Sequence, residues 1–207
     1  MNAKADRHGP QPFLSSDRLA SLSDTMFGVA MTLVATSLLP SVQNHKGSPI
    51  VMLRDMTPEL SVVVFSFIIA ARYWISQQQR LAMTASITPK QTLLHLIFLF
   101  LIVLIPISMS IPGIVGIPGI VEAKQEAVVI YGAHLMLIAL ANLLLWIEVH
   151  RSVAAHLQIV RSSLALAVFV AALAVGAVWP YLALYLWLSV FATQRLGPFL
   201  ARRVYGK

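Results

Sequence analysis

Four residues near the start of the chain have the types and spacing to line a path for a small ion. Val29, Thr32, Leu33 and Thr36 share one narrow face when residues 18–40 are wound as a helix at about 100° per residue. Branched apolar groups can close a pore by expelling water, and hydroxyl oxygens can replace part of an ion's hydration shell. The same residue types also serve close helix packing, so periodicity alone leaves pore lining and packing both open.

An acidic residue begins the same predicted helix. Asp24 follows Arg18 and Ser23, and we expect it to point away from the face just described and to be buried among neighbours. A helix N-terminus stabilises a carboxylate, whereas a carboxylate deeper in lipid is costly and needs a partner. We therefore interpret Arg18, Ser23 and Asp24 as a polar network that orients the helix. Direct contact between Asp24 and an ion is the alternative.

The helix that positions these residues belongs to a strongly apolar chain. Of 207 residues, 58% are hydrophobic and 11% are charged, whereas soluble domains carry about a quarter charged residues. The composition predicts an all-α membrane bundle. Because the chain has no cysteine, disulfides and thiolate metal sites are excluded. The net charge is +7, but no dense basic run indicates nucleic-acid binding.

Hydropathy and helix signals predict six spans, at about residues 19–40, 58–77, 91–111, 126–149, 161–178 and 181–198. Pro40 is expected to end the first span, with a polar loop at 41–49, and Pro106 to kink the third. We expect an apolar loop at 111–121, resting at the outer interface; a re-entrant filter is the alternative.

The distribution of basic residues predicts the orientation. With the N-terminus in the cytoplasm, only Lys46, Arg54 and Lys124 of the 15 Lys and Arg residues fall in outer loops, and Arg80 is among the inner ones. Both termini are then cytoplasmic. We expect a flexible cytoplasmic tail at 1–15, a six-helix transmembrane domain at 16–200 and a basic cytoplasmic tail at 201–207.

The remaining polar residues give no sign of catalysis. The motifs HExxH, GxSxG, GxGxxG and the P-loop do not occur, so we expect neither an enzyme nor a cofactor. The six histidines are scattered, and we expect no metal site. No TVGYG-like filter occurs either. We interpret His95, His134 and Asn142 as hydrogen-bonding groups between helices.

The pattern Arg18-xxx-Leu22-Ser23-Asp24 resembles the RxxxFSD signature of the transmembrane protein 175 family, which comprises bacterial and lysosomal potassium channels. The resemblance continues in Thr32, eight residues after Asp24, and over the first three predicted spans, in Ser66-Phe67, Tyr73-Trp74 and the run from Leu96 to Pro106. The last three spans fit only in number and hydropathy.

Three positions differ from the family pattern. Leu22 stands in place of its Phe, Gln77 and Gln78 stand where histidines commonly follow the second-span Trp, and His95 stands in place of an Asn.

The resemblance implies a function and an assembly. It implies a potassium channel in the inner (plasma) membrane, in which helix 1 of each copy in a homotetramer lines the pore. Carried over by distance from Asp24, the constriction would be Val29, Leu33 and Thr36, with Thr32 as a polar layer. Potassium would be the permeant ion, and the partners would be further copies of the chain and the lipid bilayer.

Two other functions stay open. A small proton- or ion-coupled secondary transporter could use Asp24, His95, His134 and Glu148 as a proton relay, although no inverted repeat is visible. The other is a scaffold protein that transports nothing.

Overall fold

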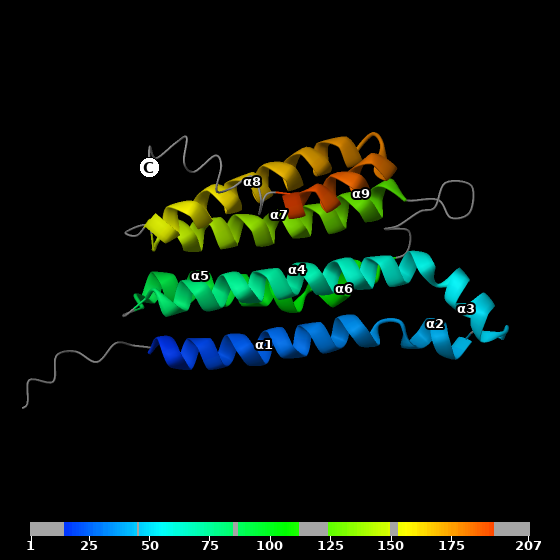
Figure 1. The fold of residues 1–207 in the computed structure, drawn as a ribbon, viewed down its shortest axis with the longest axis horizontal. Coiled ribbons are helices and arrows are strands. Elements are labelled where there is room, and N and C mark those ends of the chain that lie inside the picture. The colour runs from blue at the N-terminus through cyan, green and yellow to red at the C-terminus, as the bar shows by residue number, and fades with distance from the viewer. Residues whose placement is uncertain (1–14, 45, 85–86, 112–123, 150–152, 193–207) are drawn as a thin grey trace, which may run out of the picture.

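The computed structural model describes residues 15–44, 46–84, 87–111, 124–149 and 153–192, and every regular element within these ranges is helical. The elements are α1 (Ser16–Thr36), α2 (Leu39–Asn44), α3 (Pro49–Asp55), α4 (Thr57–Ala82), α5 (Pro89–Val103), α6 (Ile105–Met109), α7 (Gln125–Ile147), α8 (Val153–Gly176), α9 (Pro180–Ser189) and the 3₁₀ helix η1 (Val190–Ala192). The long helices run side by side along one axis, with α1 at one edge and α8 and α9 at the other (Figure 1).

Five segments in the described part of the chain are long and apolar enough to cross a membrane, at Ser16–Asn44, Thr57–Ala82, Pro89–Met109, Gln125–Ile147 and Ala155–Gly176. They correspond to the first five predicted spans. The sixth begins at Pro180, one residue before its predicted start. Residues 193–198 of this predicted span lie outside the described residues. Residues 112–121 of the predicted loop, residues 1–14 of the N-terminal tail and the C-terminal tail lie outside them as well.

Several boundaries differ from the prediction. Helix α1 ends at Thr36 and not at Pro40, which lies in the first turn of α2. The loop predicted at 41–49 holds the rest of α2 and the first residue of α3, whose N-cap Ser48 accepts a hydrogen bond from the Val51 amide and precedes Pro49 in the first turn. Helix α4 continues to Ala82 and α8 begins already at Val153, so both are longer than predicted. Helical turns of polar residues adjoin the apolar stretch of each helix.

The predicted kink of the third span is a break between two helices. Leu104 ends α5, and Pro106 lies in the first turn of α6, where its missing amide hydrogen costs nothing. His134 of α7 reaches this break through both ring nitrogens, to the Leu101 carbonyl at 2.9 Å and to the Ser108 hydroxyl at 2.6 Å. His134 therefore makes the helix-to-helix contact that the sequence predicts.

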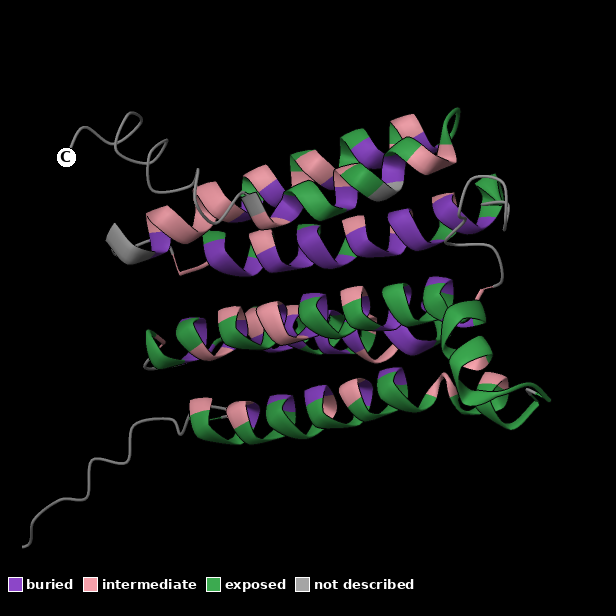
Figure 2. Ribbon diagram, turned by 45° about the vertical axis from the view of Figure 1, so that its right-hand side comes forward, coloured by how far each residue is buried: buried purple, intermediate pink, exposed green. Residues whose placement is uncertain are grey.

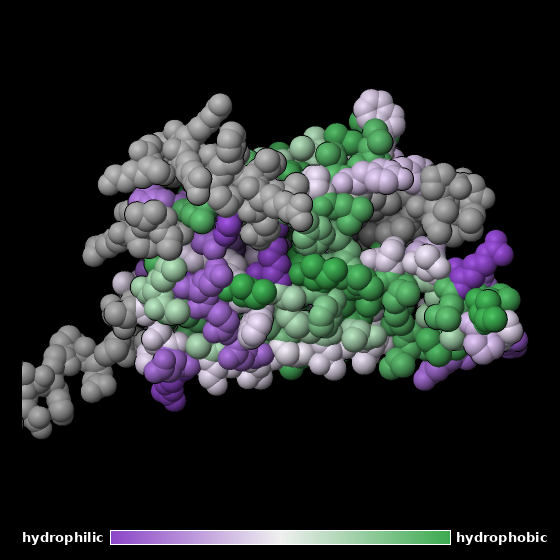
Figure 3. Space-filling model, in the orientation of Figure 1, coloured by the Kyte–Doolittle hydropathy of each residue, from purple (hydrophilic) through white to green (hydrophobic). Residues whose placement is uncertain are grey.

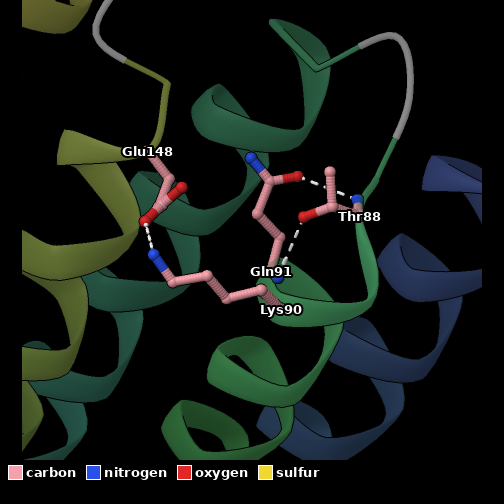
Figure 4. A network of polar contacts seen from close by, with 4 residues as sticks. All are labelled: Thr88, Lys90, Gln91 and Glu148. Carbon is pink, nitrogen blue, oxygen red and sulfur yellow. Dashed lines mark hydrogen bonds and ion pairs between the residues drawn. The ribbon is translucent and has the colours of Figure 1, made fainter.

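The start of α5 is fixed from two sides (Figure 4). Thr88 and Gln91 form a reciprocal capping box, in which each side chain accepts a hydrogen bond from the other residue's backbone amide. Lys90 donates to Glu148 at 2.6 Å and so joins the start of α5 to the end of α7. The Lys90 side chain is 77% exposed, so this ion pair contributes little to stability.

The core lies between the helices and around α7, whose residues are mostly buried (Figure 2). Aromatic rings connect its parts: Phe98 contacts Phe27 and Tyr73, and Trp187 contacts Tyr131 and Phe65. The far end of α8 packs closely, since a Cβ on Gly176 would lie 3.1 Å from the Ala183 Cβ.

The surface has the pattern of a membrane protein. Apolar side chains cover the middle of the face in Figure 3, and hydrophilic ones gather toward the end where α1 begins and α4 ends, and again around α3. This pattern suits helices that cross a bilayer with their polar ends in water.

Candidate functional site

The predicted stripe on α1 lies on the outside of the single chain. Val29 is 47% exposed and Leu33 is 46% exposed, and Thr32 and Thr36 are exposed as well. The opposite side of α1 is buried against α4 and α5 through Leu19, Phe27, Ala30 and Val34. Figure 2 shows the two sides of α1 in different colours along its length. The stripe thus faces away from the core of its own chain.

A shallow groove of about 400 Å³ runs along this outer side, lined by Asp24, Thr25, Gly28, Val29, Thr32 and Leu33. A Cβ placed on Gly28 would meet nothing within 4 Å. Gly28 therefore has no packing role inside this chain. Because it has no side chain, the surface of α1 is recessed at this point.

The threonine hydroxyls are set to accept rather than donate. Thr32 donates to the Gly28 carbonyl at 2.8 Å, Thr25 donates to Ser21 at 3.0 Å, and Thr36 donates to Leu33 at 3.2 Å. Each hydroxyl hydrogen is used within the helix, so the oxygen lone pairs remain for a partner outside it. An oxygen in this state can coordinate a cation.

Asp24 departs from the prediction in two respects. It is exposed in the single chain rather than buried, and it borders the same groove as Val29 and Thr32 instead of lying away from them. It shares the groove because Asp24, Gly28 and Thr32 follow one another at intervals of four residues, and Gly28 between them has no side chain. The carboxylate also reaches α4, where its Oδ1 accepts hydrogen bonds from Trp74 Nε1 at 2.8 Å and from Gln78 Nε2.

The other motif residues take different positions. Ser23 is fully buried; its hydroxyl donates to the Leu19 carbonyl at 2.8 Å and accepts from Gln77 Nε2 at 3.1 Å. The Arg18 side chain is exposed, and no contact to Ser23 or Asp24 is found for it among the described residues. The structure therefore joins Ser23 and Asp24 to α4 and leaves Arg18 apart from them.

Behind Ser23, a buried polar network crosses the bundle. Gln77 accepts from Arg80 Nη2, Arg80 Nη1 donates to Asn142 Oδ1 at 3.0 Å, and Asn142 Nδ2 donates to the Ser162 hydroxyl at 3.0 Å. These contacts connect α1, α4, α7 and α8 in sequence. Asn142 makes the helix-to-helix bonds that the sequence predicts.

Arg80, which the orientation prediction counts among the inner positive charges, is buried within the bundle. It is 0% exposed, with its guanidinium 5.5 Å from the Phe98 ring centre and 5.6 Å from the Trp146 ring centre. The sequence predicts no role for Arg80, and Gln77 and Gln78 stand out in it only as departures from the family pattern. The spacing of Gln77 and Arg80 by three residues is a signal that could have linked them.

Residues 18–106, which run from α1 to α6, match the family model described as endosomal/lysosomal potassium channel TMEM175. Gln77 and Gln78, which depart from the TMEM175 pattern, are the residues of α4 that hold Ser23 and Asp24. No curated protein matches the chain by sequence.

The fold extends the likeness beyond the matched residues. The chain is similar to the crystal structure of a lysosomal potassium-selective channel TMEM175 homolog from Chamaesiphon minutus, with a TM-score of 0.71. The alignment covers 88% of this chain and 97% of that chain at 14% sequence identity. The chain therefore has the TMEM175 fold, and it is a membrane protein.

One prediction tests what Asp24 does. Asp24→Asn keeps an oxygen that can accept from Trp74 and Gln78, whereas Asp24→Ala removes it. We expect the alanine variant to lose about 1–2 kcal/mol of stability against unfolding in detergent, and the asparagine variant to lose less than half of that. Potassium flux should follow stability. If Asp24→Asn folds normally and yet abolishes flux, Asp24 contacts the ion and the orienting role is wrong.

Proposed function

We propose that the chain is a potassium-permeable channel, assembled as a homotetramer around a pore lined by α1. The observation that carries this proposal is the outward stripe of Val29, Thr32, Leu33 and Thr36, which lies within a membrane-spanning segment on the side of α1 that its own chain does not cover. One helix face cannot enclose a pore, so several copies have to contribute it. The match of residues 18–106 to the TMEM175 family model supports the choice of ion.

The proposed mechanism is a hydrophobic constriction rather than a carbonyl filter. Rings of Val29 and Leu33 exclude water when they are narrow, and ions pass when the rings widen or hydrate. Potassium loses its hydration shell more easily than sodium, so a modest preference for potassium follows. The lone pairs of the Thr32 hydroxyls, whose hydrogens are used by Gly28, replace part of that shell.

The positive-inside distribution supports cytoplasmic termini, and we propose the inner (plasma) membrane as the location. In this orientation α3 lies at the outer end of the bundle (Figure 1).

A secondary transporter is the second candidate, and the contacts of its relay residues count against it. His95 bonds to the Gln91 carbonyl of its own helix, His134 bonds to Ser108 and Leu101, and Glu148 bonds to Lys90. Within the described ranges, no hydrogen bond joins these groups to one another or to Asp24. A proton relay requires such a chain or water between its members.

The experiment that tests the channel is potassium flux from liposomes containing the purified protein, compared with empty liposomes. A channel is supported if the flux is well above that of empty liposomes and does not saturate with potassium concentration. Unitary currents in a planar bilayer support it as well. Saturable flux that requires a proton or sodium gradient indicates a carrier. Tetramers that pass no ion under either condition indicate a scaffold.

A second prediction concerns Thr36, which the family resemblance places at a constriction position often held by leucine. A ring of threonines at this level should be wetter than a ring of leucines, because hydroxyl groups hold water near the axis. We expect Thr36→Leu to lower the potassium conductance by about twofold to fivefold and to raise the preference for potassium over sodium. Thr36→Ser, which keeps the hydroxyl, is the control. Unchanged conductance and selectivity in Thr36→Leu would place Thr36 outside the pore.

A further inference from the structure

The break between α5 and α6 lies at the level of the constriction proposed on α1. The rings of Phe27 and Phe98 are in contact, with centres 6.1 Å apart, and α1 and α5 begin at the same end of the bundle (Figure 1). Seven residues further along each segment, or about 10 Å, lie Val34 of α1 and Ile105, the first residue of α6. Both side chains are 0% exposed and belong to one apolar cluster. The break therefore lies behind Leu33, the neighbour of Val34 on the outward face.

One side chain connects the two sides of this break. His134 of α7 donates from Nε2 to the Leu101 carbonyl in the last turn of α5 at 2.9 Å, and its Nδ1 lies 2.6 Å from the hydroxyl of Ser108 in α6. Because a carbonyl only accepts, the neutral ring carries its hydrogen on Nε2, and the Ser108 hydroxyl donates to Nδ1. The imidazole therefore holds α5 through one nitrogen and α6 through the other.

Helix α6 depends on such contacts for its position. It has five residues, and a helix of this length is not stable by itself. Because the helical backbone is interrupted before it, α5 does not dictate its direction. Helix α6 contacts α1, α4 and α7, and Ile105, Pro106 and Met109 are its buried residues. The bond from Ser108 to His134 thus attaches α6 to α7, a long helix whose residues are mostly buried.

Helix α6 is also part of the surface against which α1 rests. Ala30 and Val34 are buried residues of α1 near this level, and they share an apolar cluster with Ile105 and Met109 of α6. The opposite side of α1 carries Leu33, which is exposed in the single chain. A displacement of α6 would therefore allow α1 to move back from the proposed pore axis at the level of Leu33.

We propose that His134 and Ser108 are positioning residues for the constriction. Their hydrogen bond holds α6 against α1 and keeps the ring of Leu33 side chains narrow. This inference rests on the proposed function, because only a pore lined by α1 has such a ring. Neither residue touches the ion, since both act through α6 and α1. When the bond is lost, α6 shifts, and the ring widens and hydrates more readily.

The test compares Ser108→Ala with Ser110→Ala in reconstituted protein. Ser110 has the same side chain, but its hydroxyl donates at 2.6 Å to the Pro106 carbonyl of α6 and not to α7. We expect Ser108→Ala to raise potassium flux by about threefold and to lower the preference for potassium over sodium, because a hydrogen bond between membrane helices contributes modestly. Ser110→Ala should match the wild type. Wild-type flux and selectivity in Ser108→Ala, or an equal change in Ser110→Ala, overturns the proposal.

Two further variants separate a positioning role from a general loss of stability. His134→Asn retains an amide oxygen that can accept from Ser108, so it should keep most of the wild-type selectivity, whereas His134→Leu should change it at least as much as Ser108→Ala. In a Leu33→Ala background the ring is already wide, so Ser108→Ala should add little to the flux. A full further rise in that double variant overturns the proposal.

A labelling measurement tests the same role without ion conduction. Because the sequence has no cysteine, Leu33→Cys introduces a single thiol. Its rate of reaction with a charged, water-soluble thiol reagent in liposomes reports how well water reaches this position. We expect the rate to rise several-fold when Ser108→Ala is added and to stay constant when Ser110→Ala is added. Equal rates overturn the positioning role. Wild-type protein that passes no potassium contradicts the proposed channel instead, and the labelling rate still decides whether Ser108 positions Leu33.

Discussion

Leu33→Ala is expected to raise potassium flux through reconstituted protein by at least about fivefold and to reduce the preference for potassium over sodium. Leu33 is 46% exposed on the outward face of α1, in the middle of a membrane-spanning segment. If four copies of this face surround the pore, the substitution removes a branched side chain from each of them. The ring widens and hydrates more readily, and a fivefold rise corresponds to a barrier lower by about 1 kcal/mol.

A matched control separates the pore from general leakiness. Leu137 of α7 is 45% exposed, nearly the same fraction as Leu33, but it lies on a different helix within the span. Leu137→Ala should therefore leave flux and selectivity at wild-type levels. An equal rise in both variants would mean that either substitution loosens the bundle, and no change in Leu33→Ala would remove Leu33 from the conduction path.

Arg80→Ala is expected to produce the largest loss of stability among single substitutions in the described part of the chain. Arg80 is 0% exposed, hydrogen-bonds to Gln77 and Asn142, and lies against the rings of Phe98 and Trp146. Alanine leaves a cavity and two buried amides without their partner. We expect a loss of about 2–4 kcal/mol, of which the larger part comes from packing, since hydrogen bonds between membrane helices contribute modestly.

The measurement is reversible unfolding of the purified protein in mixed micelles at a fixed ratio of protein to detergent. Arg80→Met retains much of the volume without the hydrogen bonds and should lose less than half as much, which separates packing from polar contacts. Arg54→Ala, on the exposed side of α3, is the control for removing an arginine. The prediction fails if Arg80→Ala and Arg54→Ala unfold at the same detergent composition.

The sequence predicts the helices of this fold well because each has a long apolar run bounded by recognisable signals. Thr57-Pro58-Glu59 marks the start of α4, and Pro106 marks the break after α5. The sequence does not predict α2 and α3, because these helices are too short for periodicity to be visible. The local signal for α3 is Ser48-Pro49.

The candidate site could be predicted mainly on its outward side. The stripe from Val29 to Thr36 follows from helical winding, and the structure places all four residues on the exposed face. Behind the stripe, the sequence predicts the helix-to-helix role of Asn142. It does not predict the burial of Arg80, because that burial depends on rings supplied by α5 and α7, which are distant in sequence. The exposure of Asp24 likewise depends on which residues of α4 lie opposite it.

The side-chain hydrogen bonds between α1 and α4 are made by serine, aspartate, tryptophan and glutamine, and none of them involves an imidazole. Histidine is the side chain whose ordinary pKa places a change of charge between about pH 5 and pH 8. Glutamine carries the same charge at every acidity that a cell meets. Gln77 and Gln78 therefore add no titratable group to these hydrogen bonds, and Asp24 is the one ionisable side chain among the five that make them.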